Sequence, residues 1–141
     1  MTTGYSGIPL AAKIGVKEGQ HVTLIGAPRG WSIDDLPAKV HVTRRRGAST
    51  HDIAIAFLRD TASLNREIAS LSRTITPDGS LWIAWPRRAG GHRSDLTDDV
   101  VRSAVLPLGL VDVKVAALDD DWSALKMVWR KEVRAKPRRG Q

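Results

Sequence analysis

The sequence predicts an α/β fold of three layers, in which a mostly parallel sheet ends in an antiparallel hairpin. Short apolar runs, typical of buried strands, are separated by turns and by segments with helical periodicity through most of the chain. The last two strands instead alternate apolar and polar residues, which is typical of an antiparallel pair with one wet face. The length, 141 residues, fits one domain.

The first half of the chain begins with a short helix. Residues 6–15 predict it, because Pro9 suits the first turn of a helix and Gly15 suits its end. Three strands are expected next, at 21–27, 39–43 and 51–58. The third strand is apolar on both faces, which predicts a central strand covered from both sides. The links 28–38 and 44–50 leave no room for a full helical crossover, so the first half of the fold is expected to be shortened.

The next segment predicts a helix followed by a buried strand. Asp60 is an expected N-cap, and apolar residues recur at helical spacing over 61–75. Residues 77–79, Pro-Asp-Gly, predict a turn that ends this helix. A strand is then expected over 80–85.

The last third predicts one more helix and the closing hairpin. The helix begins near Thr97, and strands are expected at 111–115 and 125–129. Valines alternate with Asp112 and Lys114 in the first of these strands. We therefore expect the valines on its covered face and the two charged residues on its wet face.

The net charge of +7 is concentrated at the C-terminus. Residues 130–141 hold six basic side chains and one acid, so this segment alone carries +5. We expect residues 1–132 to form the domain and 133–141 a disordered basic tail. The chain has no cysteine and no secretory signal, which predicts a reducing, cytoplasmic setting.

Arginines follow several of the predicted strands. Arg29, Arg44 and the pair Arg87-Arg88 each come after a strand end, and the carboxyl ends of parallel strands meet at one edge, where such sheets bind ligands. Guanidinium groups suit bidentate contacts with anions. The sequence therefore predicts a basic, anion-binding crevice at this edge. Its candidate residues are Gly26, Pro28, Arg29, Gly30, Trp31, Arg44, Trp85, Arg87 and Arg88.

A second candidate surface is a nucleic-acid interface. It would combine the arginine run after the second strand with the basic tail. Its candidate residues are Arg44, Arg45, Arg46, Arg134, Lys136, Arg138 and Arg139.

The order of elements, with a Thr-Pro-Asp-Gly-Ser-Leu segment at 76–81, is similar to the class I S-adenosylmethionine-dependent methyltransferase family. The resemblance implies a Rossmann-like, methyltransferase-like sheet, here with a shortened first half. The family's acidic Gly-x-Gly-x-Gly motif is replaced by residues 25–30, Ile-Gly-Ala-Pro-Arg-Gly. Pro28 also removes a backbone N–H from this loop. The family's ribose-binding acid would fall at 43–46, which reads Thr-Arg-Arg-Arg.

Longer strings resemble an actinobacterial family known only as a domain of unknown function. They lie at residues 5–10, 82–86, 95–102 and 107–115, and the resemblance spans 4–132. It implies the same fold and a bacterial cytoplasmic setting, and it implies no activity or substrate.

We therefore expect a small cytoplasmic, non-catalytic protein that binds an anionic ligand or a protein partner in the basic crevice. Two alternatives stay open: a divergent S-adenosylmethionine-dependent methyltransferase, and a nucleic-acid-associated protein. No cofactor, catalytic residue, metal site or membrane partner is expected, and a homodimer stays open.

Overall fold

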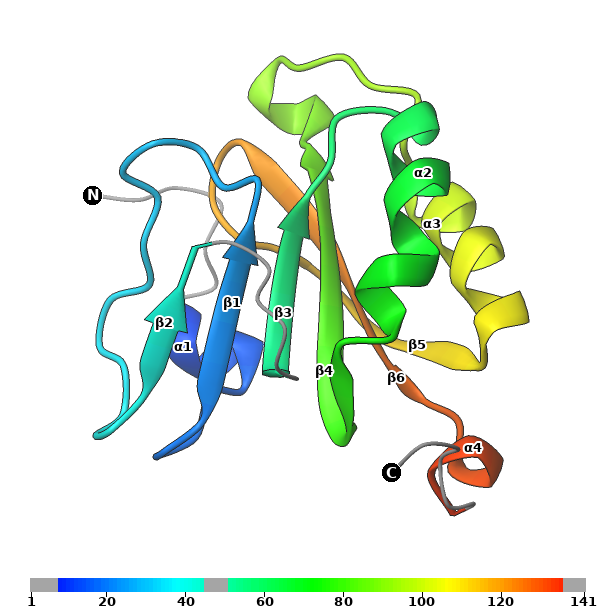
Figure 1. Cartoon of the computed structure of the whole chain (residues 1–141). Helices are drawn as coiled ribbons and strands as arrows, with labels where there is room; N and C mark the ends of the chain where they lie inside the picture. Colours follow the sequence, from blue (N-terminus) through cyan, green and yellow to red (C-terminus); the bar gives the residue numbers. More distant parts are fainter. Residues whose placement is uncertain (1–7, 45–50, 136–141) are drawn as a thin grey trace.

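A computed structural model describes residues 8–44 and 51–135. These residues form a six-stranded sheet in the order β2-β1-β3-β4-β6-β5, with helices on both faces (Figure 1). The elements are α1 (Leu10–Ile14), β1 (His21–Ile25), β2 (His41–Thr43), β3 (His51–Phe57), α2 (Thr61–Ser72), β4 (Ile75–Pro86), η1 (Arg88–Gly90), α3 (Asp98–Val105), η2 (Leu106–Leu108), β5 (Leu110–Ala117), β6 (Trp122–Trp129) and α4 (Lys131–Ala135). Of the helices in these ranges, none has the length and apolar character needed to cross a membrane.

The sheet is parallel except at its C-terminal end. β2, β1, β3 and β4 pair in the same direction, whereas β6 runs antiparallel to both β4 and β5. α2 and α3 lie on one face of the sheet and α1 lies on the other (Figure 1). Residues 26–40, which connect β1 to β2, contain no helix. The structure thus confirms the predicted three-layer α/β fold with a shortened first half.

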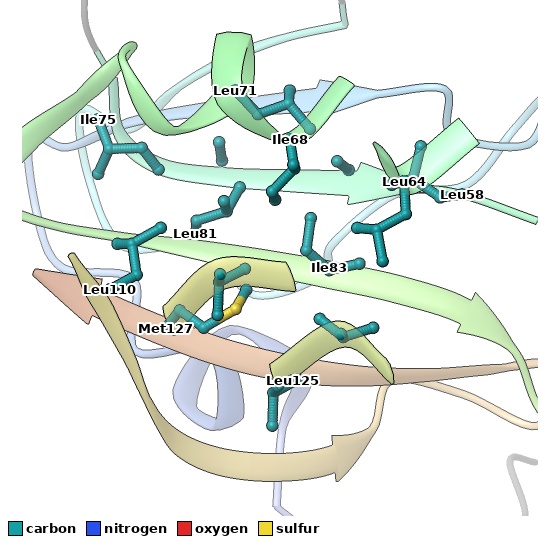
Figure 2. Packing of buried hydrophobic residues seen from close by; sticks show 14 of the residues in the cluster. Leu58, Leu64, Ile68, Leu71, Ile75, Leu81, Ile83, Leu110, Leu125 and Met127 are labelled. Atoms are coloured by element: carbon teal, nitrogen blue, oxygen red, sulfur yellow. The ribbon is translucent and has the colours of Figure 1, made fainter. Parts of the chain in front are cut away.

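Two apolar layers hold the helices to the sheet. On one face, Leu64, Ile68 and Leu71 of α2 pack over Leu81 and Ile83 of β4 (Figure 2). The cluster on the opposite face, beneath α1, includes Ile14, Leu24, Ile55, Trp82 and Leu118. β3 and β4 are therefore buried on both faces, as predicted for the third strand.

The predicted end of the helix at 61–75, with a turn at 77–79, is wrong. α2 ends at Ser72, and the chain then enters β4 directly. The carbonyl of Thr74 accepts a hydrogen bond of 2.7 Å from the backbone N–H of His51, which draws this segment into the sheet. Pairing with β3 therefore overrides the helical spacing and the local turn signal.

The Pro-Asp-Gly segment lies instead within an irregular part of β4. The pairing of β4 with β3 shifts register between His51 and Ile53, which is typical of a β-bulge. A Cβ added at Gly79 would lie 2.5 Å from the carbonyl oxygen of Asp52. The glycine is therefore required by close backbone approach across the sheet.

The predicted faces of the first hairpin strand are also wrong. The pairing of β5 with β6 shifts register between Asp112 and Lys114, which leaves Val113 as an extra residue. Val113 is 54% exposed and Val115 is 51% exposed. The Asp112 carboxylate lies 2.9 Å from Nε of Arg102 on α3. A β-bulge thus interrupts the predicted alternation: Val113 and Val115 are exposed, Asp112 is half-buried, and Lys114 is exposed as expected.

Two further boundaries differ from the prediction. β2 begins at His41 and not at residue 39, because Lys39 adopts a left-handed backbone conformation with φ of 62°. α4 extends to Ala135, and Val133 packs against the core. The expected boundary between residues 132 and 133 therefore falls inside a helix, and residues 136–141 of the predicted tail lie outside the described residues.

A buried histidine joins the first three strands. His51 is 1% exposed, and its Nδ1 lies 2.7 Å from Oγ1 of Thr23, which in turn lies 3.0 Å from Oγ1 of Thr43. The His21 ring meets the His51 ring edge-on at 5.1 Å. Burial, and next the nearby His21, lower the pKa of His51, while Asp52 opposes this shift. The fold therefore favours the neutral imidazole.

We expect the stability of the protein to fall in mild acid because of His51. In the unfolded chain this residue binds a proton near the ordinary pKa of 6.5, whereas in the folded protein the pKa of His51 is lower and protonation needs a more acidic pH. The contribution of His51 to the free energy of unfolding is complete above pH 6.5 and declines as the pH falls toward the lower pKa of the folded state. Urea unfolding between about pH 8 and 5 measures it. His51→Gln should make the free energy of unfolding less dependent on pH, whereas the control substitution at an exposed position, His41→Gln, should not. Equal slopes in both variants would contradict this assignment.

Candidate functional site

The loop after β1 makes a tight turn beside the end of β3. Gly26 has φ of 71°, and a Cβ added there would lie 2.9 Å from the carbonyl oxygen of Phe57. The N–H of Trp31 donates to the carbonyl of Pro28 at 3.0 Å, which closes the next turn. Gly30 also has positive φ, at 80°. The backbone of this loop is therefore held close to the carboxyl edge of the sheet.

A hollow of about 620 Å³ opens between this loop and the end of β2. A guanidinium nitrogen of Arg44 donates to the carbonyl of Trp31, which ties the two walls together. Arg29 and Arg44 both line the hollow, and no carboxylate is among its described lining residues. The lining consists of Gly26, Ala27, Pro28, Arg29, Gly30 and Arg44.

The arginines that follow β4 lie at a second hollow of about 300 Å³. Arg87 and Arg88 line it together with His92. The Arg87 N–H donates to the carbonyl of Asp121 at 2.7 Å, and its guanidinium reaches the carbonyl of Asp120 at 3.5 Å. The structure thus places the predicted arginines at two neighbouring hollows, with Arg29 and Arg44 in one and Arg87 and Arg88 in the other.

A third hollow of about 150 Å³ lies between these two. It shares Pro28 with the first and His92 with the second. The Arg59 guanidinium lies over the Trp122 ring, 5.1 Å from its centroid, and both residues line this hollow. His92 Nε2 lies 2.9 Å from a carboxylate oxygen of Asp121.

The sequence analysis missed Arg59 and the His92–Asp121 pair. Arg59 follows the end of β3, so the reasoning that selected the other arginines also applies to it. The His92–Asp121 contact joins residues 29 positions apart and has no local signal in the sequence.

The two candidate tryptophans have different surroundings. Trp31 is half-buried, and its indole N–H donates to the carboxylate of Asp119 at 2.9 Å. Its ring meets that of Phe57 edge-on at 4.8 Å. Trp85 is 7% exposed and belongs to the core cluster under α2 and α3, although it also lines the second hollow. Neither ring offers a free face comparable to an exposed aromatic platform.

The candidate nucleic-acid residues are separated where the structure describes them. Arg44 follows the carboxyl end of β2, whereas Arg134 belongs to α4, which follows the antiparallel strand β6 at the opposite edge of the sheet (Figure 1). The other candidates, Arg45, Arg46, Lys136, Arg138 and Arg139, lie outside the described residues.

The chain is similar in fold to solved methyltransferases. A TehB-like S-adenosylmethionine-dependent methyltransferase from Corynebacterium glutamicum is 11% identical with a TM-score of 0.56, over 87% of this chain and 89% of that one. A putative methyltransferase from Thermoplasma acidophilum is 10% identical with a TM-score of 0.55, over 83% and 71%. Magnesium protoporphyrin IX methyltransferase from Synechocystis, solved with bound S-adenosylmethionine, is 8% identical with a TM-score of 0.54, over 86% and 74%.

These likenesses define a methyltransferase-like Rossmann fold for the chain. Identities this low show the fold alone, because one fold hosts many functions. No family model matches the chain, so its resemblance to the family of unknown function stays a prediction. No curated protein matches it either.

We expect Gly26→Ala to destabilise the protein more than Gly30→Ala. Both residues have positive φ, which costs an alanine about 1–2 kcal/mol. At Gly26 the new methyl also meets the Phe57 carbonyl, whereas no atom lies within 4 Å at Gly30, and overpacking adds about 1–3 kcal/mol. Urea unfolding measures the two losses. Equal losses would show that the loop does not turn against β3 as described.

Proposed function

We propose that this chain is a binding protein that holds an anionic small molecule in the hollow between residues 26–30 and Arg44. The observation that carries the proposal is the placement of two arginine side chains around a hollow with no carboxylate among its described lining residues. The hollow lies where β1 and β2 end, the usual ligand edge of such sheets. Its volume, about 620 Å³, suits a small molecule.

The lining favours binding over catalysis. Its described residues are glycine, alanine, proline and arginine, and none of these side chains is a good general base or nucleophile at neutral pH. Arginine presents a fork of N–H donors that matches a phosphate or carboxylate group. Arg44 is already oriented by the Trp31 carbonyl, which reduces the entropy lost when a ligand binds.

We expect Arg44→Gln to weaken anion binding about tenfold or more, because hydrogen bonds to charged groups contribute about 1.5–3 kcal/mol. Pyrophosphate is the probe, and isothermal titration calorimetry measures its Kd. Arg66→Gln is the matched control, because this substitution removes the same charge at an exposed position on α2. The proposal would be contradicted if both substitutions weakened pyrophosphate binding equally, or if the unaltered protein did not bind pyrophosphate.

A second candidate function is a divergent S-adenosylmethionine-dependent methyltransferase. The similarity of fold to solved methyltransferases favours it, including one solved with this cofactor bound. The first hollow offers a poor fit to the cofactor, because no carboxylate lines it to accept hydrogen bonds from ribose hydroxyls. The position after β2 that an acid occupies in the family is held by Thr43 and Arg44.

S-Adenosylmethionine separates the two candidates in one titration series. The anion-binding proposal predicts no saturable heat with this compound at concentrations where pyrophosphate binds. Saturable binding of S-adenosylmethionine, with pyrophosphate inactive, would instead favour the methyltransferase. S-Adenosylhomocysteine serves as a second probe, because it has the same adenosine and lacks the positive charge at sulfur.

A further inference from the structure

The three hollows at the carboxyl edge are neighbours that share lining residues. Pro28 lines both the first and the middle hollow, while Pro86 and His92 line both the middle and the second. A fourth hollow, of about 460 Å³, continues from Arg88 and His92 to Arg93. We call these hollows together the edge groove. Its lining residues follow the ends of β2, β3 and β4. These strand ends lie along one edge of the sheet (Figure 1).

Arginines line every part of the edge groove. The first hollow has Arg29 and Arg44, and the middle one has Arg59. The remaining hollows are lined by Arg87, Arg88 and Arg93. No lysine is among the described residues that line the groove. This composition favours phosphate groups, since arginine binds them through paired N–H donors.

Two carboxylates, those of Asp98 and Asp121, line the groove, and both of these and the neighbouring Asp60 are engaged in contacts within the protein. Asp60 accepts from the N–H of Ser63 at 2.8 Å, and this bond lowers the pKa of its carboxyl. Asp98 pairs with Arg102, and Asp121 pairs with His92.

Asp119 accepts hydrogen bonds from Trp31 and from two backbone N–H groups of its own turn. In contrast, Arg29, Arg59, Arg88 and Arg93 have no carboxylate partner among the described residues. The described lining of the groove therefore holds six arginines and two carboxylates, which leaves it with a net positive charge.

A single small anion uses only part of this arrangement. Two arginines in the first hollow already suffice for one phosphate group, and four more follow along the groove. A row of separated cations matches a chain of separated phosphates. The middle hollow has a volume of about 150 Å³ and supplies one arginine, Arg59, between the arginines of its neighbours.

We propose that the edge groove binds the phosphate backbone of a single-stranded nucleic acid, with the first hollow holding one of its phosphates. This inference rests on the proposed function, because the anion of the first hollow becomes one unit of a longer chain. Trp85 and Trp122 are 7% and 5% exposed, so they do not form a stacking platform for bases. Recognition through the backbone makes the binding insensitive to base sequence and strongly dependent on salt.

Fluorescence anisotropy with labelled oligothymidylates of about 3, 6 and 12 nucleotides tests the inference on the full chain. We expect affinity to rise with length. The double variant Arg88→Gln/Arg93→Gln should weaken the longest oligonucleotide about tenfold and reduce the log–log salt slope by about 1.4. It should leave pyrophosphate binding unchanged. The matched control Arg66→Gln/Arg73→Gln removes the same charge from α2 and its C-cap and should change neither measurement.

The outcomes separate this inference from the proposed function. Affinity that is independent of length, with pyrophosphate still sensitive to Arg44→Gln, overturns the groove and keeps the small-anion site. Tighter binding of a duplex of the same length overturns the single-stranded assignment. Equal weakening by the two double variants overturns the groove, because it reports net charge alone. Pyrophosphate binding that Arg44→Gln leaves intact overturns the proposed function itself.

Discussion

The pairing of β3 with β4 is the constraint on which the rest of the structure depends. The two strands run in register from Ile53 opposite Ser80 to Phe57 opposite Ala84, and both are buried between helical layers. A shift of one residue would expose the apolar side chains of one face. Because burial sets the register, both strands end at the same edge of the sheet. Arg59 follows β3 and Arg87 follows β4, and these two arginines line neighbouring hollows at that edge.

The antiparallel strand β6 determines what else reaches that edge. β6 runs antiparallel to β4, so it begins at the carboxyl edge of the parallel strands and ends at the opposite edge. The acidic turn that precedes β6 therefore lies at the carboxyl edge, whereas α4, which follows β6, lies at the opposite edge (Figure 1). The acids of this turn hold Trp31 and His92 in place. These contacts support the surrounding loops.

The methyltransferase-like fold of this chain carries a candidate site whose described lining is glycine, alanine, proline and arginine. The sheet order and the closing hairpin are shared with enzymes that use S-adenosylmethionine, yet the fold by itself assigns no reaction. The candidate site combines a glycine turn that packs closely against β3, a proline within the loop, and Arg44 directly after β2. These features support the binding of anions through backbone geometry and guanidinium groups.

The sequence by itself determined the layers, the buried strands and the helix starts, because these follow from periodicity and from local capping by Asp60 and Thr97. It also determined that arginines follow the strand ends. Only the tertiary structure decided that Pro77-Asp78-Gly79 lies inside β4 and that Val113 and Val115 are exposed. Both features follow from β-bulges. The position of a bulge depends on the pairing with the neighbouring strand, and a local sequence pattern carries no information about that pairing. For the same reason, the division of the crevice into hollows, and the contact of His92 with Asp121, required the packed fold.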